Sequence, residues 1–336
     1  MEQPANKILI VTPVFDEERN LESTARALAA QTAPPTRWVV VDDGSRDGTL
    51  ALARRLAAEI DFMDVITSGD LEVDGADKLA EAREARAFNL GLAHAGWRDY
   101  DFIGKLDGDV ELPPEWLASL MTRFADHPRL GLAGGRLVEA DEDGGWNRLE
   151  IPAHHVHGAV KLFRRQCLEE IGGIPERLAW DTIDETYARM RGWETRSFDD
   201  IVARHNRPWG SADGRLRGRA RHGECAWILH YDPFWVTLRS VKVGRSSPPV
   251  VSGAAFLYGY VRAAASGVPR VEDPEFRRFT RGELRSRMRR AVSRRQVETQ
   301  SDRKIDGGSP VASSVAQGVE GPRQKEEIVY GRDRQD

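Results

Sequence analysis

This sequence of 336 residues contains few cysteines and has no excess of positive charge. The two cysteines, Cys167 and Cys225, lie far apart, which excludes a zinc ribbon or a disulfide framework and favours a reduced cytosolic compartment. The 49 Lys and Arg residues are outnumbered by 53 Asp and Glu residues, so the formal net charge is −4. This balance argues against nucleic acid as the main partner.

Long apolar runs are missing as well. The most apolar stretch, residues 250–265, is interrupted by Gly259 and Arg262 and falls short of the ~20 residues that a membrane-spanning helix needs. Residues 1–7 carry one basic residue and lead into no secretory signal segment. We therefore expect a cytoplasmic protein that does not cross a membrane, although contact with the inner face of the plasma membrane is open to it.

The first 140 residues alternate short β-branched runs with segments of helical period, a pattern typical of βαβ units that feed a parallel sheet. The expected strands are residues 7–12, 38–42, 62–67, 100–106 and 130–138, and the expected helices are 17–31, 49–58, 76–95 and 113–124. Further helices are expected at 164–171 and 180–192, and two short strands between 194 and 205. The sequence therefore predicts an α/β fold with a mostly parallel sheet flanked by helices.

The second half of the chain has a different composition. Residues 206–225 are rich in Arg and Gly without an apolar period, which predicts a long mobile loop. Helical period returns at residues 226–243 and 254–265. Residues 270–295 hold ten Arg against four acidic residues, a local charge of +6.

Composition thus divides the chain into three parts. We expect a catalytic domain in residues 1–225 and a helical appendage, basic at its end, in residues 226–295. Residues 296–336 are polar and poor in aromatic residues, which predicts a disordered tail.

Polar residues follow three of the expected parallel strands: Thr12-Pro13, Asp42-Asp43 and Asp107-Gly108-Asp109. Parallel strands deliver their carboxyl ends to one crevice. Carboxylates gathered there repel each other unless a cation or a donor-rich ligand lies between them. This arrangement indicates a metal-assisted site for a polyanion.

Three of these segments resemble the family 2 glycosyltransferases of the GT-A (Rossmann-like) fold. They are residues 11–17 (VTPVFDE), 41–49 (VDDGSRDGT) and 107–109 (DGD). Residues 180–185 (WDTIDE), the Gly192-Trp193 pair and His205 extend the resemblance over about residues 7–205. It implies an inverting, metal-dependent transfer of a sugar from a nucleotide sugar to an acceptor hydroxyl, in polysaccharide or glycolipid assembly.

The resemblance also implies roles for single residues. Asp109 would ligate Mg²⁺ or Mn²⁺, with Asp107 towards the ribose or a metal-bound water and His205 in the metal shell; a purely structural His205 is equally open. Asp43 would accept a hydrogen bond from the base of a UDP- or GDP-linked donor. The remaining expected substrate contacts are Thr12, Pro13, Phe15, Asp16, Glu17, Arg83 and Trp180, where Arg83 is open to being only a solvated helix residue.

Inversion needs one general base that removes the proton of the acceptor hydroxyl. The acidic pair that relatives carry before the helix is incomplete here, and the candidates are Asp181, Asp184 and Glu185. We take Asp184 as the base, because Asp184-Glu185 keeps an acidic pair. Asp181 stays open, since it lies at a similar distance from Gly192 as in some relatives.

Other clusters support weaker interpretations. His154, His155 and His157 lack a fourth ligand at zinc spacing and fit an acceptor cleft or a strand better. The basic residues 215–222 either clamp a diphosphate as a lid or form a solvated loop. The basic segment 270–295, with Phe276, Phe279, Leu284 and Met288, either contacts an anionic membrane, which suits a lipid-linked acceptor, or is a solvated helix.

Two other functions compete with sugar transfer. A sugar-phosphate nucleotidyltransferase needs a basic, Gly-rich loop after the first strand, whereas residues 13–18 (PVFDEE) are acidic and would repel a sugar phosphate. A non-catalytic protein that binds nucleotide sugars is also compatible with the incomplete acidic pair.

Overall fold

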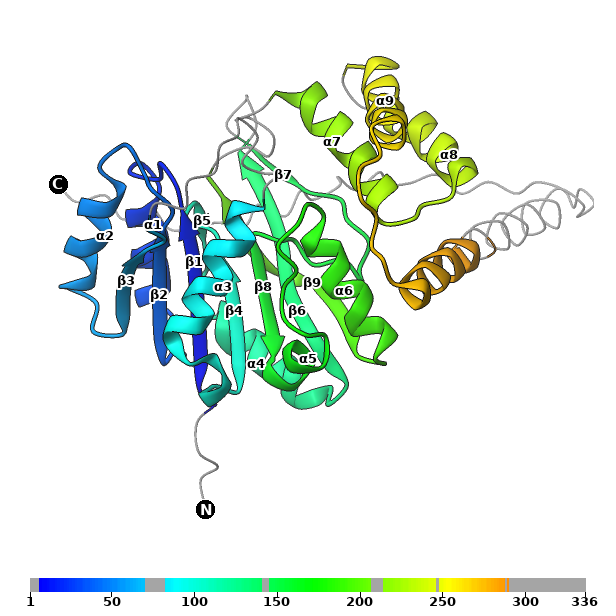
Figure 1. The fold of residues 1–336 in the computed structure, drawn as a ribbon. Helices are drawn as coiled ribbons and strands as arrows, with labels where there is room; N and C mark the ends of the chain where they lie inside the picture. Colours follow the sequence, from blue (N-terminus) through cyan, green and yellow to red (C-terminus); the bar gives the residue numbers. More distant parts are fainter. Residues whose placement is uncertain are drawn as a thin grey trace, which may run out of the picture. The chain divides into compact units, whose positions relative to one another are not determined.

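The computed structural model describes residues 6–69, 82–140, 145–206, 214–245, 248–287 and 289. In this part of the chain nine strands form one sheet (Figure 1). The strands are β1 (Ile8–Val14), β2 (Arg37–Asp42), β3 (Met63–Thr67), β4 (Phe102–Leu106), β5 (Val110–Glu111), β6 (Leu130–Ala140), β7 (Trp146–Arg148), β8 (Val160–Arg164) and β9 (Glu194–His205).

The sheet is mixed, with the order β3-β2-β1-β4-β8-β6-β9-β5 and with β7 beside β6. Strands β1 to β4 are parallel to one another, as the βαβ pattern predicts. Strand β8 is antiparallel to both β4 and β6, and it separates the parallel half from the rest. The segment from 194 to 205, expected as two strands, is the single strand β9, whose pairing with β6 is irregular at two points.

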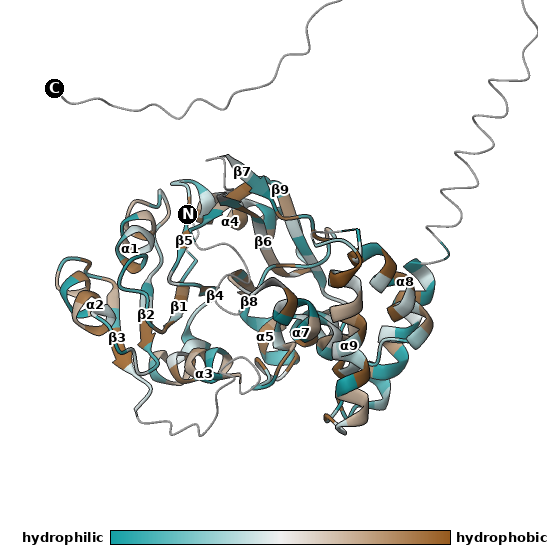
Figure 2. Cartoon of the chain, turned by 90° about the horizontal axis from the view of Figure 1, so that it is seen from above, coloured by the Kyte–Doolittle hydropathy of each residue, from teal (hydrophilic) through white to brown (hydrophobic). Residues whose placement is uncertain are grey.

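Helices cover both faces of the sheet (Figure 2). One apolar cluster contains side chains of α1 (Leu21–Ala29), α2 (Thr49–Ala57) and α4 (Trp116–Asp126). A second contains side chains of α3 (Arg83–Ala95), α5 (Arg165–Glu170) and the start of α6 (Trp180–Met190). A single turn of 3₁₀ helix, η1 (Trp97–Asp99), follows α3.

Alternation along the central strands explains this layering. In β1, Ile8 and Ile10 pack into the first cluster, whereas Leu9 and Val11 pack into the second. Successive side chains of a strand point to opposite faces, so a strand covered on both sides is apolar throughout. The continuous run ILIV is therefore a consequence of helices on both faces.

The segment expected as a loop at residues 206–225 is helical over much of its length. Helix α7 (Arg215–Ile228) crosses the expected boundary between residues 225 and 226. The helix expected at 226–243 is in fact the end of α7 followed by α8 (Pro233–Val243), because Asp232 accepts a hydrogen bond from the Phe234 amide and caps a new helix.

Helix α9 (Val251–Ala265) follows, and residues 274–287 are also helical. The chain divides into a compact unit of residues 1–286 and a second unit of residues 287–336. The predicted disordered tail at 296–336 and the distal part of segment 270–295 lie outside the described residues. Among the helices described, none has both the length and the apolar character required to cross a bilayer.

Close helix contacts through glycine hold α9 against α7. A side-chain carbon added at Gly259 would collide with the backbone carbonyl of Ala220, and one added at Gly223 would collide with that of Phe256. The backbone cannot yield as a flexible side chain does. Only glycine therefore fits at these two crossings.

We predict that Gly259→Ala destabilises the protein by about 3 kcal/mol or more, because overpacking here meets backbone atoms. Gly282→Ala is the matched control, since no heavy atom lies within 4 Å of a carbon added there. This change is expected to be neutral or to stabilise by up to about 1 kcal/mol. Denaturant unfolding measures both; equal stability of the two variants would contradict the packing argument.

Candidate active site

The carboxyl ends of the parallel strands meet at one edge of the sheet. Asp43 follows β2, and Asp107 follows β4. Strand β5 begins just after Asp109 and pairs antiparallel with β9, which sets Val110 opposite His205. The sheet therefore brings together side chains that lie far apart in the sequence.

Asp107, Asp109 and His205 form a cluster with ligand atoms within 4.8 Å of one another, the one such metal-binding group found in the described part of the chain. The Nε2 atom of His205 lies 3.3 Å from Oδ1 of Asp109. Two carboxylates and an imidazole suit Mg²⁺ or Mn²⁺ by their chemistry. The residues present thus fit the ion that the sequence motif indicates.

His205 is nearly buried between two carboxylates. Its Nδ1 atom lies 3.0 Å from Oε1 of Glu139, and Asp109 faces its other nitrogen. Burial opposes a charged ring, but the hydrogen bonds to Asp109 and Glu139 outweigh it and raise the pKa of His205 to about 10. Coordination of an ion through Nε2 would therefore release a proton.

A buried lysine holds Asp107 in place. Lys105 on β4 contacts the carboxylates of both Glu84 and Asp107. Burial alone would lower the pKa of Lys105, but these two acids raise it well above its ordinary value. The ring of Trp180, an expected substrate contact, lies 5.3 Å from Nζ of both Lys105 and Lys161, and Trp180 is 9% exposed.

Asp43 and Arg83 form an ion pair. The Nε atom of Arg83 donates to Oδ2 of Asp43 over 2.8 Å, and Ser68 Oγ donates to Oδ1 over 2.9 Å. Arg83 also lies 5.8 Å from the ring of Phe15. Asp43, the expected contact to the nucleobase, is therefore a direct neighbour of Arg83, an expected substrate contact at the start of α3.

The other residues expected to hold the nucleoside have partners inside the protein. Thr12 is buried and accepts a hydrogen bond from the indole of Trp38, whereas Pro13 lies beside it and is partly exposed. Asp16 has a φ of +55° and accepts from the Arg46 amide over 2.7 Å. Glu17 is nearly buried, and its carboxylate accepts from Asn20.

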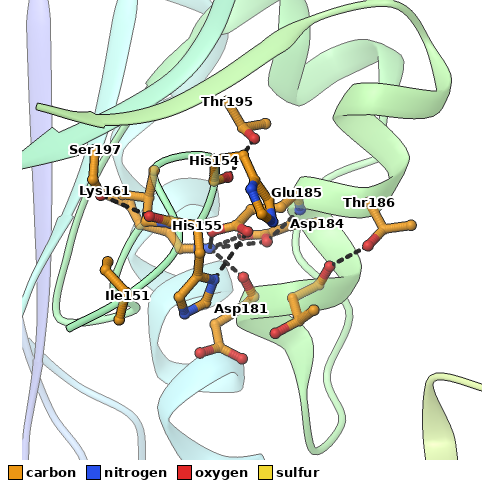
Figure 3. A network of polar contacts seen from close by, with 12 residues as sticks. Ile151, His154, His155, Lys161, Asp181, Asp184, Glu185, Thr186, Thr195 and Ser197 are labelled. Atoms are coloured by element: carbon orange, nitrogen blue, oxygen red, sulfur yellow. Dashed lines mark hydrogen bonds and ion pairs between the residues drawn. The ribbon is translucent and has the colours of Figure 1, made fainter. Parts of the chain in front are cut away.

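Asp184 lies in a buried polar network (Figure 3). Both of its carboxylate oxygens accept from Nζ of Lys161 over 2.9 Å, and neither residue is exposed to solvent. Glu185 accepts from the Val156 amide over 2.7 Å and pairs with His155 over 3.0 Å. The network ties β8, α6 and the 155–156 loop together.

Burial and the neighbouring charges have opposite effects on the pKa values of the two acids in this network. Burial raises the pKa of Asp184 to about 7, although Lys161 favours its ionised form. Burial acts the same way on Glu185, but His155, Lys161 and the Val156 amide outweigh it and lower the pKa of Glu185 to about 2. Glu185 is thus the more firmly ionised of the two acids.

Asp181 has a different environment from Asp184. It lies in the first turn of α6 and is partly exposed, and only its backbone oxygen accepts from Lys161, over 2.6 Å. Among the described residues its carboxylate makes no hydrogen bond or ion pair, and Figure 3 shows it outside the contacts around Lys161. Asp184 is therefore enclosed, whereas the carboxylate of Asp181 is partly exposed.

The buried lysines were missed by motif reasoning. Lys105 and Lys161 each interrupt an apolar strand, within FIGKL and VKLFR. A lysine inside an otherwise apolar strand signals a buried acidic partner, because an unpaired buried charge is too costly. The contact of Glu139 with His205 was missed as well. No feature of the sequence indicates it, because Glu139 lies near the end of a strand and the segment that follows it is also acidic.

Two further histidines, His157 and His222, interact electrostatically with Asp181. His157 is mostly buried; burial and the neighbouring His155 lower the pKa of His157 to about 4. On α7, burial and the charges of Arg239 and Arg219 lower the pKa of His222 to about 4 as well. Residues 215–222 belong to helix α7 and are not the loop expected from the sequence, whereas their role as a diphosphate clamp stays a prediction.

Residues 9–175 match the family described as glycosyl transferase family 2. The chain is 24% identical to Glycosyltransferase AglE of Haloferax volcanii over 221 residues, 60% of this chain and 68% of that protein. It is 29% identical to polyprenol monophosphomannose synthase of Mycolicibacterium smegmatis over 185 residues, 50% of this chain and 66% of that protein. The chain thus spans about two thirds of the length of these relatives.

The fold is similar to that of the mannosyltransferase PcManGT from Pyrobaculum calidifontis, solved in complex with GDP-Man and Mn²⁺. The TM-score is 0.50 at 18% identity, covering 82% of this chain and 83% of that one. The sheet and its helical layers therefore have the GT-A fold. More specifically, the chain belongs to glycosyl transferase family 2 and is a nucleotide-sugar-dependent glycosyltransferase.

Proposed function

We propose that this enzyme transfers a sugar with inversion from a UDP- or GDP-linked donor to an acceptor hydroxyl, with Mg²⁺ or Mn²⁺ bound by Asp107, Asp109 and His205. The observation that carries the proposal is the metal-binding group at the edge of the sheet. Two further groups would have complementary tasks, the Asp43–Arg83 pair and the start of α6.

The ion would be held by Asp109 and His205, with Asp107 oriented by Lys105. When bound, it would offset negative charge on the diphosphate that leaves as the glycosidic bond breaks. Glu139 keeps the His205 ring in orientation through Nδ1, so that Nε2 faces the ligand side.

We assign the general base to Asp181. A base must reach the acceptor hydroxyl. The carboxylate of Asp181 meets this condition, because it is partly exposed and makes no hydrogen bond or ion pair with the described residues. Asp184 does not meet it, because both of its oxygens are bonded to Lys161 in the interior. We assign Asp184 instead to holding the first turn of α6 through Lys161.

At the nucleoside of the donor, Asp43 would accept a hydrogen bond from the nucleobase. Its carboxylate is fixed by Arg83 and Ser68, which leaves a second lone pair on each oxygen for a ligand. The ring of Phe15 borders the same pair. A carboxylate acceptor suits the ring N–H of uracil or guanine, which supports a UDP- or GDP-linked donor.

For the acceptor, we propose a hydroxyl of a lipid-linked sugar in cell-surface polysaccharide or glycolipid assembly. The relatives support this choice, since one is a polyprenol monophosphomannose synthase. Another is a poly-β-1,6-N-acetyl-D-glucosamine synthase of Staphylococcus epidermidis.

We predict that Asp109→Asn lowers donor turnover at least about 100-fold and removes its dependence on Mn²⁺, because the variant loses a charged ligand. Release of UDP or GDP, measured with Mn²⁺ and after chelation, provides the test. Asp61→Asn is the control and should retain full activity. It changes an exposed carboxylate just before β3, at the amino end of that strand and not at the carboxyl ends that form the site. Undiminished, metal-stimulated turnover by Asp109→Asn would refute the metal assignment.

The nucleotidyltransferase alternative has less support. The loop after β1 is acidic, and Asp16 and Glu18 accept hydrogen bonds from the amides of Arg46 and Gly48. A sugar phosphate would approach this loop against like charge. Release of diphosphate from a nucleoside triphosphate in the same assay would favour that alternative.

A further inference from the structure

Helices α8 and α9 expose a concentration of large apolar side chains. Of the eleven exposed large apolar residues in the described part of the chain, eight lie between residues 234 and 261. Scattered single residues of this kind are ordinary, whereas a cluster marks an interaction surface. We call these eight residues the apolar face: Phe234, Leu238, Val241, Val250, Val251, Leu257, Tyr258 and Val261.

The spacing of these residues gives each helix an outer apolar stripe. On α8, Phe234, Leu238 and Val241 follow one another at intervals of four and three residues, as on one side of a helix. On α9, the residues between members of the face, such as Phe256 and Tyr260, are buried against α7 and α8. Helix α9 is therefore apolar all round, a property of helices with a partner on every side.

The two stripes meet at one end. The Val250 amide donates to the Gly244 carbonyl over 2.7 Å, and Gly253 packs on the backbone of Ser240 and Gly244. The end of α8 thus contacts the start of α9, and the helices lie side by side (Figure 2). Val241 and Val251 are exposed at this junction, so the apolar face extends over both helices.

The charges on the helices that carry the apolar face have a single sign. Residues 233–271 contain no Asp or Glu, although the whole chain has a net charge of −4. Lys242 and Arg245 are exposed at the end of α8, and Arg262 on α9 pairs with Glu224 over 3.0 Å. A second copy of this face would bring like charges together, whereas anionic lipid offers opposite charge beside an apolar phase.

We propose that α8 and α9 dock on an anionic lipid bilayer, with the apolar face in the boundary between headgroups and acyl chains. Lys242 and Arg245 then lie among the headgroups, where each contributes to binding. The docking does not depend on the transfer reaction, whereas the choice of a lipid-linked acceptor rests on the proposed function.

This proposal places the membrane contact on α8 and α9, whereas membrane contact through segment 270–295 was one of two interpretations of the sequence. In its described part, Phe276 and Leu284 are buried, and the Phe276 ring lies 5.2 Å from that of Tyr187. Its apolar side therefore packs on protein, and the exposed Arg277 and Arg285 offer charge only.

Docking through α8 and α9 has a consequence for the active site. Helix α7 packs on α9, and its His222 lies within electrostatic range of Asp181. A bilayer bound by α8 and α9 would thus lie on the same side of Asp181, the proposed general base, as α7 does. A lipid-linked acceptor could then present its headgroup to Asp181 without leaving the membrane.

The test is co-sedimentation of the full chain with vesicles of phosphatidylcholine alone or with about one third phosphatidylglycerol. The wild type should bind the anionic vesicles, and Phe234→Ser/Val261→Ser should lower the association constant at least about tenfold. Leu90→Ser/Trp146→Ser removes two exposed apolar side chains elsewhere and should bind as the wild type. Lys242→Gln/Arg245→Gln should reduce the preference for anionic over neutral vesicles.

Several results would overturn the proposal. Failure of the wild type to bind anionic vesicles, or equally strong binding of neutral vesicles, would contradict docking on anionic lipid. Undiminished vesicle binding by Phe234→Ser/Val261→Ser would show that the apolar face is not the contact. A wild-type dimer that this variant disperses, without vesicle binding, would assign the face to a second copy. Turnover of a soluble donor by the same variant, measured without vesicles, should be unchanged, which separates failure of docking from failure of the proposed reaction.

Discussion

Asp181→Asn is expected to lower the turnover number about 1000-fold while the Michaelis constant for the donor changes little. The amide keeps the size of the side chain but cannot take the proton of the acceptor hydroxyl, and a general base contributes about 10²- to 10⁴-fold. Asp181 contacts no other side chain by hydrogen bond or ion pair among the described residues, so folding should be unaffected. Initial rates of nucleotide release with saturating acceptor provide the measurement.

Asp184→Asn is the matched comparison. It is the same chemical change three residues along the same helix, but at a carboxylate bound to buried Lys161. We expect reduced stability and nearly normal turnover per folded molecule. If Asp184→Asn folds as the wild type but loses turnover, while Asp181→Asn keeps it, the base is Asp184.

Lys161→Met is expected to destabilise the protein by about 3 to 5 kcal/mol. This substitution leaves the buried carboxylate of Asp184 without its counter-charge and the Asp181 carbonyl without its donor. Denaturant unfolding at neutral pH measures the loss. Lys242→Met, at an exposed lysine, should change stability by less than about 0.5 kcal/mol.

A second substitution shows whether the pair itself is responsible. Lys161→Met/Asp184→Leu replaces the pair with apolar side chains and should recover most of the lost stability, because a packed apolar pair often equals a buried ion pair. A double variant no more stable than Lys161→Met would show that Glu185, also 3.4 Å from Lys161, is the partner that matters.

The strand pattern of the sequence predicts the first half of the sheet well. Strands β1 and β2 are apolar on both faces, and the alternation with helices leaves few other arrangements. Helix α7 is different, because its residues Arg215–Ile228 carry many arginines and glycines and show little apolar periodicity. It is held by close backbone contacts at Gly223 and Gly259, which no pattern of hydrophobicity reveals.

The candidate metal ligands and the proposed general base show that the sequence also predicts only part of the site. Asp107 and Asp109 follow a buried strand, so their place at the sheet edge can be read from the sequence. Asp181 and Asp184 lie one turn apart on α6, and both look suitable there. What separates them is Lys161 on β8, a long-range partner whose position depends on the antiparallel insertion of that strand.

Thermal unfolding with a panel of UDP-, GDP- and dTDP-sugars, with and without Mn²⁺, tests the central claim of metal-assisted donor binding most directly. A ligand that binds only the native state adds about 2.7 kcal/mol at a hundred times its dissociation constant. We predict that a UDP- or GDP-linked sugar raises the melting temperature with Mn²⁺, and that Asp109→Asn abolishes this rise. A rise that is the same without Mn²⁺ and in Asp109→Asn, or no rise with any donor, would contradict the account.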